Sequence, residues 1–195
     1  SNPDDEVFSD YPLRSDPRRV ETLTSTGGVL TFCLSGLSKI CGLPQMKLAW
    51  IVVNGPRQLA LQAFQRLELV ADTYLSVGAP VQHALPKLLA IGRSVRDQIL
   101  RRTAANLATL RAALGERSAC QVLEVEGGWC AVVRVPRVLT EEEWTLTLLE
   151  QDGVLVQPGF FFDFESEAYL VVSLLTHPAT FRLIGTDAPS LSRGL

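Results

Sequence analysis

The segment on which the expected fold depends most reads Gly36-Leu37-Ser38-Lys39-Ile40-Cys41-Gly42-Leu43-Pro44-Gln45-Met46-Lys47-Leu48-Ala49. Two apolar runs flank it: the β-branched and aromatic residues of Val29–Leu34 predict a buried strand, and Leu48–Val53 predicts a second apolar strand. The small residues that follow the first run, from Ser35 to Lys39, predict a turn. An amine in such a turn is poorly hydrated, which favours a nucleophilic lysine, although a surface charge is the simpler interpretation of a single lysine.

Composition and charge place the chain among globular proteins. Its 195 residues are 47% hydrophobic and 20% charged, which is enough to form a core in one or two domains. The 18 basic and 21 acidic residues argue against a nucleic-acid binder, which would carry an excess of positive charge. No apolar run has the length of a membrane span, and the polar start Ser1–Asp4 is unlike a signal peptide. We therefore expect a cytoplasmic protein that binds neither nucleic acid nor membrane.

The cysteines and histidines do not form a pattern typical of metal sites. None of the four cysteines belongs to a Cys-x-x-Cys pair, and the chain has two histidines, so we expect no zinc or other metal centre. A disulfide-stapled scaffold is not expected at this size and cysteine content. The cysteines are interpreted as reduced core residues: Cys33, Cys41, Cys120 and Cys130.

The middle of the chain has the apolar spacing of helices. A first helix is predicted over residues 57–75, a second over Val81–Ala90, and a third from Gly92 to a stop at Gly115. The apolar face of the first helix consists of Leu61, Phe64, Leu67, Ala71 and Tyr74, and that of the third of Val95, Ile99, Leu107, Leu110 and Leu114. A basic stripe on the third helix is interpreted as a solvated face: Arg93, Arg96, Arg101, Arg102 and Arg111.

The last third of the chain is predicted to be a small α+β unit. Gly127-Gly128 indicates a hairpin between the runs Gln121–Glu126 and Trp129–Val135. Thr140 and Glu143 have the spacing of a capping box, which predicts a helix through Gln151 that ends at Gly153. The remaining predicted elements are the strands Val154–Val156 and Tyr169–Leu174, a short helix from Pro178, and a loose tail over 185–195.

Two segments together carry a resemblance to a known family. The segment around Lys39 resembles the lysine signature of class I/II aminotransferases, which are pyridoxal-phosphate (PLP) enzymes of fold type I in the aspartate aminotransferase superfamily. Asp5-Glu6-Val7-Phe8, which lies 34 residues before Lys39, resembles the Asp-x-x-Tyr strand end of that family. Weaker likenesses at Ser76–Ala84 and Gly153–Gly159 follow in the family's order, and the resemblance covers roughly residues 4–182.

The resemblance implies a role for each matching residue. Lys39 would hold the cofactor aldehyde as a Schiff base, and its amine would later move a proton at the substrate α-carbon. Asp5 would keep the pyridine nitrogen protonated, because a carboxylate stabilises the positive charge of that nitrogen. Ser38 and Lys47 fall where the family binds the cofactor phosphate with hydroxyl groups and cations.

Three positions depart from the family pattern. Phe8 stands where the family has a tyrosine, so the ring can pack against the cofactor without donating a hydrogen bond. Lys47 replaces an arginine, which keeps the charge and loses the bidentate fork. In the family, an arginine in this part of the chain binds the substrate α-carboxylate. The matching substrate-binding position here is Val171, within a strand that has no arginine. Either another cation replaces that arginine, or the substrate is not an ordinary α-amino acid.

The implied architecture is an α/β fold, the C-terminal half of a fold type I PLP enzyme. We expect the end of the large-domain sheet in residues 1–91, a linking helix in 92–117, a small α+β domain in 118–185 and a tail in 186–195. The implied function is transfer of an amino group between an amino acid and a keto acid by a homodimer. Because other PLP contacts of the family lie in its N-terminal half, this chain alone is expected to bind PLP poorly or not at all.

Two other functions remain open. The first is a PLP-dependent carbon–sulfur lyase on the same fold, and the second is a non-catalytic, degenerate homologue that acts as a dimerisation module. Three further features have a simpler structural interpretation beside a functional one. Phe160-Phe161-Phe162 is interpreted as core rather than substrate pocket, His83 as a surface residue and His177 as part of a turn.

Overall fold

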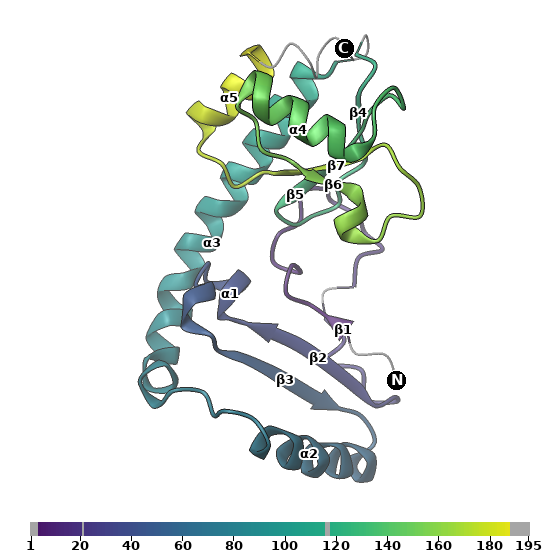
Figure 1. Cartoon of the computed structure of the whole chain (residues 1–195). Helices are drawn as coiled ribbons and strands as arrows, with labels where there is room; N and C mark the ends of the chain where they lie inside the picture. Colours follow the sequence, from purple (N-terminus) through teal and green to yellow (C-terminus); the bar gives the residue numbers. More distant parts are fainter. Residues whose placement is uncertain (1–3, 21, 116–117, 188–195) are drawn as a thin grey trace. The chain divides into compact units, whose positions relative to one another are not determined.

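The computed structural model describes residues 4–20, 22–115 and 118–187, with backbone alone for residues 4–5 and 183–187. The chain comprises two compact units, Ser1–Gln98 and Ile99–Leu195. Figure 1 shows the helices and strands of both units. The division into 1–91, 92–117, 118–185 and 186–195 stays a prediction, and residues 188–195 of the predicted tail lie outside the described residues.

A three-stranded sheet forms the centre of the first unit, in the order β1-β2-β3. The strands are β1 (Asp4–Asp5), β2 (Thr31–Gly36) and β3 (Ala49–Asn54). β1 pairs in parallel with β2, with Asp5 opposite Leu34, while β2 and β3 are antiparallel, with Cys33 opposite Val52. The two strands predicted around Lys39 are therefore confirmed, with ends shifted by one or two residues.

A helical turn follows β2 where a turn of small residues was expected. The strand continues through Gly36, and α1 (Leu37–Ile40) contains Lys39. A second short helix, η1 (Pro44–Met46), leads to β3. Leu37 and Cys41 are fully buried and pack with Leu48, and partly buried residues such as Leu85 and Leu88 pack against this cluster. The segment that joins β2 and β3 therefore lies on a small core shared with these residues.

One long helix replaces two predicted ones. α3 (Ala79–Ala113) is continuous through Pro86 and Gly92, so the predicted break between Val81–Ala90 and a helix after Gly92 is wrong. Gly92 has a different role: it is buried, and a Cβ there would lie 2.2 Å from the Cys41 Sγ atom. The glycine therefore lets α3 approach the segment that follows α1.

The helix predicted over 57–75 exists as α2 (Arg57–Asp72), but its predicted apolar face is wrong. Leu61 and Phe64 are 57% and 58% exposed, and Tyr74 is 74% exposed. The buried residue of the helix is Ala63. The apolar period therefore identified the helix, while its least exposed residues are Ala63 and, half-buried, Ala60 and Leu67.

The second unit contains a four-stranded antiparallel sheet in the order β4-β5-β7-β6. The strands are β4 (Gln121–Val122), β5 (Cys130–Arg134), β6 (Gln157–Pro158) and β7 (Tyr169–Ser173), joined by α4 (Glu141–Asp152) and η2 (Gly159–Phe162) and followed by α5 (Pro178–Asp187). The predicted pairing around Gly127-Gly128 is confirmed, although β4 is much shorter than the predicted run. The predicted strand Val154–Val156 is wrong, because that segment precedes the short β6.

The core of the second unit combines helix and strand residues. Leu107 and Leu110 of α3 are buried, which confirms the predicted face at that end of the helix. Trp144 and Leu148 of α4 are fully buried, as is Leu170 of β7. The expectation that all cysteines are core residues is wrong for Cys130, which is exposed, while Cys33, Cys41 and Cys120 are buried.

Candidate active site

Lys39 lies at the carboxyl end of a parallel strand pair. Asp5 is the last residue of β1 and stands opposite Leu34 of β2, and Lys39 follows β2 within α1. In open α/β sheets, ligands bind at the edge where the carboxyl ends of neighbouring parallel strands meet. The backbone of Asp5 and the Lys39 segment therefore share the edge at which such a site is expected. The Asp5 side chain lies outside the described part of the chain.

The Phe8 ring lies beneath the Lys39 ammonium. The Lys39 Nζ atom is 5.5 Å from the centre of the ring, within the range of a cation–π interaction. Phe8 is 40% exposed and packs edge-on against Tyr11, with 6.5 Å between the ring centres. The predicted site residues Phe8 and Lys39 are thus brought together, and both remain partly accessible to solvent.

Tyr11 is a residue of this site that the sequence motifs did not reveal. Its side chain is fully buried, and its hydroxyl donates a hydrogen bond of 2.5 Å to the Lys39 backbone carbonyl. The Tyr11 amide also donates to the Phe8 carbonyl at 3.0 Å. The spacing Phe8-x-x-Tyr11 closes a turn, yet a single tyrosine in a polar loop carries no sequence signal for such a bond.

Cys41 joins the segment around Lys39 to α3, and Arg96 joins the turn before Tyr11 to the same helix. The Cys41 thiol donates to the Leu88 carbonyl at 3.5 Å and lies against Gly92. Burial raises the pKa of the Cys41 thiol, which opposes thiolate chemistry there. The Arg96 guanidinium pairs with the Asp10 carboxylate at 3.3 Å. This arginine of the predicted solvated stripe therefore has a partner next to Tyr11.

The two residues expected to bind phosphate differ in their surroundings. Ser38 is half-buried within α1, directly before Lys39. Lys47 is exposed and ends η1 in the left-handed region, with φ of 49°. Both belong to the segment between β2 and β3, which places a hydroxyl group and a cation on the same connection as the lysine.

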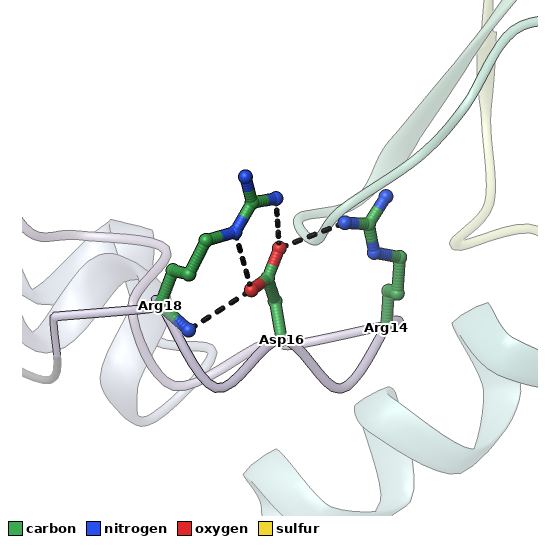
Figure 2. A network of polar contacts seen from close by, with 3 residues as sticks. All are labelled: Arg14, Asp16 and Arg18. Carbon is green, nitrogen blue, oxygen red and sulfur yellow. Dashed lines mark hydrogen bonds and ion pairs between the residues drawn. The ribbon is translucent and has the colours of Figure 1, made fainter.

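A loop after Tyr11 contains a network of charged side chains (Figure 2). Residues 12–17 and Arg19 line a hollow with a volume of about 570 Å³. The Asp16 carboxylate accepts from the Arg18 side chain at 2.8 and 3.1 Å, from the Arg18 amide at 2.9 Å and from Arg14 at 2.7 Å. The hydrogen bonds from Arg18, and to a lesser degree that from Arg14, hold the pKa of Asp16 well below its usual range. Arg14 and Arg18 are thus engaged by a carboxylate of the same loop.

Val171, the position expected to bind substrate carboxylate, lies in the middle of the sheet of the second unit. It is 5% exposed and stands opposite Val132 of β5 and Gln157 of β6. No residue of β7 is an arginine. The strand thus offers no cation at the position where an arginine was expected to bind the substrate carboxylate.

Glu141 has a structural role that its place in the capping segment did not suggest. It is 2% exposed, and its two carboxylate oxygens accept from the Phe160 and Tyr169 amides, each at 2.8 Å. Phe160, Phe161 and Phe162 are 51%, 67% and 47% exposed, so the interpretation of this cluster as core is wrong. Each lies in η2, which the Glu141 carboxylate holds at its first turn.

The two histidines occupy the places that a structural interpretation assigned to them. His83 is exposed on α3. The His177 Nδ1 atom accepts from the Ala179 amide at 3.3 Å at the start of α5. Within residues 4–20, 22–115 and 118–187, no group of three or more His, Cys, Asp or Glu residues is arranged to hold a metal ion. In that same part of the chain, no helix combines the length and apolarity needed to cross a bilayer.

Comparison with known proteins agrees with the geometry. The family model described as "Aminotransferase class I and II" matches residues 5–183. The chain therefore belongs to the class I/II aminotransferase family, as the segments around Asp5 and Lys39 predicted. Glutamate-pyruvate aminotransferase AlaA of Haemophilus influenzae is 26% identical over 159 residues, which are 75% of this chain and 38% of that protein. AlaA of Escherichia coli K12 is 30% identical over 95 residues, 49% of this chain and 23% of that protein.

Solved structures show the same fold. An aminotransferase from Escherichia coli superposes with a TM-score of 0.79 at 19% identity, over 96% of this chain and 48% of that one. Tyrosine aminotransferase from Leishmania infantum gives a TM-score of 0.75 at 16% identity, over 96% of this chain and 47% of that one. The predicted α/β architecture of a fold type I PLP enzyme is confirmed, and the chain spans about half the length of these structures.

Proposed function

We propose that this chain is the lysine-bearing part of a PLP-dependent aminotransferase, which moves an amino group between an amino acid and a keto acid. The observation that carries the proposal is the placement of Lys39 at the carboxyl end of β2, beside β1, with its ammonium over the Phe8 ring. Membership of the class I/II family supports the same reaction class.

The donor set at this edge of the sheet fits PLP. The cofactor aldehyde requires an amine, its ring an apolar face, and its phosphate a hydroxyl group and a cation. Lys39, Phe8, Ser38 and Lys47 would supply these groups, and Lys39 and Phe8 are in contact. Asp5, at the end of β1, would supply the carboxylate for the ring nitrogen. When bound, PLP supplies the electron sink that lets an amino acid lose its α-proton.

The residues of the chain have separate tasks in this reaction. The Lys39 amine would bind the cofactor aldehyde and, once an amino acid has displaced it, would accept the proton from the substrate α-carbon. Phe8 would pack against the ring and offer no hydrogen bond. Lys47 would attract the phosphate as a point charge without the bidentate geometry of arginine.

The group that would bind the α-carboxylate of the substrate does not lie in β7. β7 has no arginine to grip an α-carboxylate, and Val171 is buried in the sheet. The relatives AlaA are named for the glutamate–pyruvate pair, so alanine with 2-oxoglutarate is the first pair to assay. We propose that a cation outside β7 takes the place of the missing arginine.

Two further proposals concern the whole protein. We propose that it acts as a homodimer in the cytoplasm, and that this chain alone binds PLP weakly. The length match supports the weak binding, since the chain spans 48% of the Escherichia coli structure, and the apolar side chains that the chain leaves exposed support an interface. Among these are Ile51 of β3 and Leu59 and Leu61 of α2, which are 46%, 49% and 57% exposed.

The test is amino transfer by wild type and two lysine variants. Protein that contains this chain is incubated with PLP, alanine and 2-oxoglutarate, and pyruvate and glutamate are measured. Lys39→Arg should reduce the rate of transfer by at least about 10³-fold, because arginine keeps the charge and cannot bind the aldehyde. Lys87→Arg on α3 is the matched control and should retain activity. Equal activity of Lys39→Arg and wild type would refute the proposal, and release of ammonia with pyruvate from a thioether amino acid would indicate the lyase instead.

A further inference from the structure

The buried phenol of Tyr11 has its hydroxyl bonded to the main chain of Lys39. A fully buried tyrosine hydroxyl requires a partner, and the Tyr11 hydroxyl donates to the Lys39 carbonyl at 2.5 Å. The same carbonyl accepts from the Gly42 amide at 3.3 Å. The Lys39 carbonyl therefore accepts one bond from a neighbouring amide and one from a residue 28 positions earlier.

The turn that contains Tyr11 contacts both the main chain and the side-chain amine of Lys39. The Tyr11 hydroxyl reaches its carbonyl, and the Phe8 ring lies 5.5 Å from its Nζ atom. The Tyr11 amide closes the turn on the Phe8 carbonyl at 3.0 Å. Next to Tyr11, Asp10 pairs with Arg96 of α3 at 3.3 Å, which fixes the turn to the helix.

We propose that Tyr11 is a positioning residue for Lys39, acting through the lysine backbone and through the Phe8 ring that it packs against. The inference rests on the proposed function, because it assigns Tyr11 a task in the use of the Lys39 amine. The hydroxyl fixes the backbone from which the lysine side chain extends, and the ring beneath the ammonium restricts where the amine lies. Tyr11 touches neither the reacting atoms nor the cofactor in this role.

The experiment compares Tyr11→Phe with Tyr74→Phe in the full chain. Tyr74 is 74% exposed, so its variant is a matched loss of one phenol hydroxyl. Two readouts need no cofactor. The first is hydrogen exchange of the Cys41, Gly42 and Leu43 amides, which donate to Leu37 or Lys39. The second is the labelling rate of the Lys39 amine by an acylating reagent, relative to Lys47 and Lys87 of the same molecule.

Tyr11→Phe should accelerate exchange at these amides by about 2- to 10-fold, as expected for the loss of one hydrogen bond. It should also change the labelling of Lys39 relative to Lys47 and Lys87, whereas Tyr74→Phe should change neither. Faster exchange throughout the unit with an unchanged relative labelling of Lys39 would show a purely structural role and overturn the proposal. So would unchanged exchange at all three amides.

A second variant keeps the proposal testable if Tyr11→Phe does not fold. Phe8→Leu removes the ring beneath the ammonium and leaves the Tyr11 hydroxyl in place, so Lys39 labelling should change while exchange at Gly42 does not. Unchanged Lys39 labelling in Phe8→Leu would contradict the proposal. The cofactor reaction separates the two claims. If wild type fails to react with PLP while Tyr11→Phe alters Lys39 labelling, the positioning role stands and the aminotransferase proposal fails. If wild type reacts with PLP and Tyr11→Phe behaves as wild type in exchange and labelling, the aminotransferase proposal stands and the positioning role fails.

Discussion

Cys41 occupies the space that a side chain at Gly92 would need. A Cβ atom added to Gly92 would lie 2.2 Å from the Cys41 Sγ atom and 2.8 Å from its Cβ atom. Cys41 is fully buried and directly follows α1, which carries Lys39. The close approach of α3 therefore fixes the position of the segment that holds the candidate active-site lysine.

Gly92→Ala should destabilise the chain by about 1–3 kcal/mol, the usual effect of overpacking a core, even though alanine is the better helix former. The measurement is the midpoint of urea unfolding. Gly78→Ala is the control, since its nearest neighbour would be a Pro80 side-chain atom at 3.9 Å. A Gly92→Ala chain as stable as wild type would show that α3 does not pack against Cys41 as described.

Glu141→Ala should destabilise the second unit, because it removes the acceptors of two backbone amides, Phe160 and Tyr169. A buried donor left without a partner costs about 1–3 kcal/mol, so the expected loss is at least about 2 kcal/mol. Chemical unfolding measures this loss. The neighbouring exposed Glu142→Ala serves as the control and should change stability by less than about 0.5 kcal/mol.

The capping box of α4 should make a pH-dependent contribution to stability. The Thr140 amide, and after it the Thr140 hydroxyl, donates to the Glu143 carboxylate and lowers the pKa of that group. A lowered folded-state pKa stabilises the fold above the unfolded value of about 4.3, and this contribution is lost as the pH falls through the folded value. The difference in unfolding free energy between wild type and Glu143→Gln should therefore shrink from pH 7 to pH 3.

A constant difference between these two proteins over that pH range would contradict the ionised capping box. Thr140→Ala provides a second check at pH 7. Its hydroxyl accepts from the Glu143 amide at 3.2 Å, and loss of an N-cap hydroxyl costs about 1 kcal/mol.

Asp16→Asn should loosen the loop after Tyr11 without unfolding the chain. The variant weakens the bonds to the Arg14 and Arg18 side chains, which are near the surface, so the global stability should stay close to that of wild type. Trypsin should cut after Arg14 faster than in wild type, because the guanidinium is no longer held. An unchanged cleavage rate, with Asp72→Asn on α2 as the control, would show that Asp16 does not order the loop.

Sequence signals predicted an element correctly where its formation depends on residues close together in the chain. The apolar runs on either side of Lys39 became β2 and β3, and the Thr140–Glu143 pattern became the capping box of α4, a helix that ends at Gly153 with φ of 65°. Each of these features depends on a few neighbouring residues and on hydrogen bonds between them. The family motifs around Asp5 and Lys39 predicted the fold in the same way.

Features that depend on contacts between distant segments were not predictable from the sequence. Gly92 indicates a helix break by propensity alone, and only the contact with Cys41 shows why a glycine stands within the continuous α3. Tyr11 and Lys39 are 28 residues apart, and no pattern indicates their hydrogen bond. Glu141 lies next to the Thr140–Glu143 capping pattern, and nothing in that pattern indicates its two partners at Phe160 and Tyr169.

Peptide mapping after borohydride treatment of the PLP-incubated protein tests the role of Lys39 most directly. Reduction fixes a pyridoxyl group on the lysine that has bound the aldehyde, and mass spectrometry then locates it. The placement of Lys39 beside Phe8 at the end of β2 predicts the mark on Lys39, with little on Lys47 or Lys87. A mark distributed evenly over the three lysines, or absent from Lys39, would contradict the assignment of this lysine to PLP.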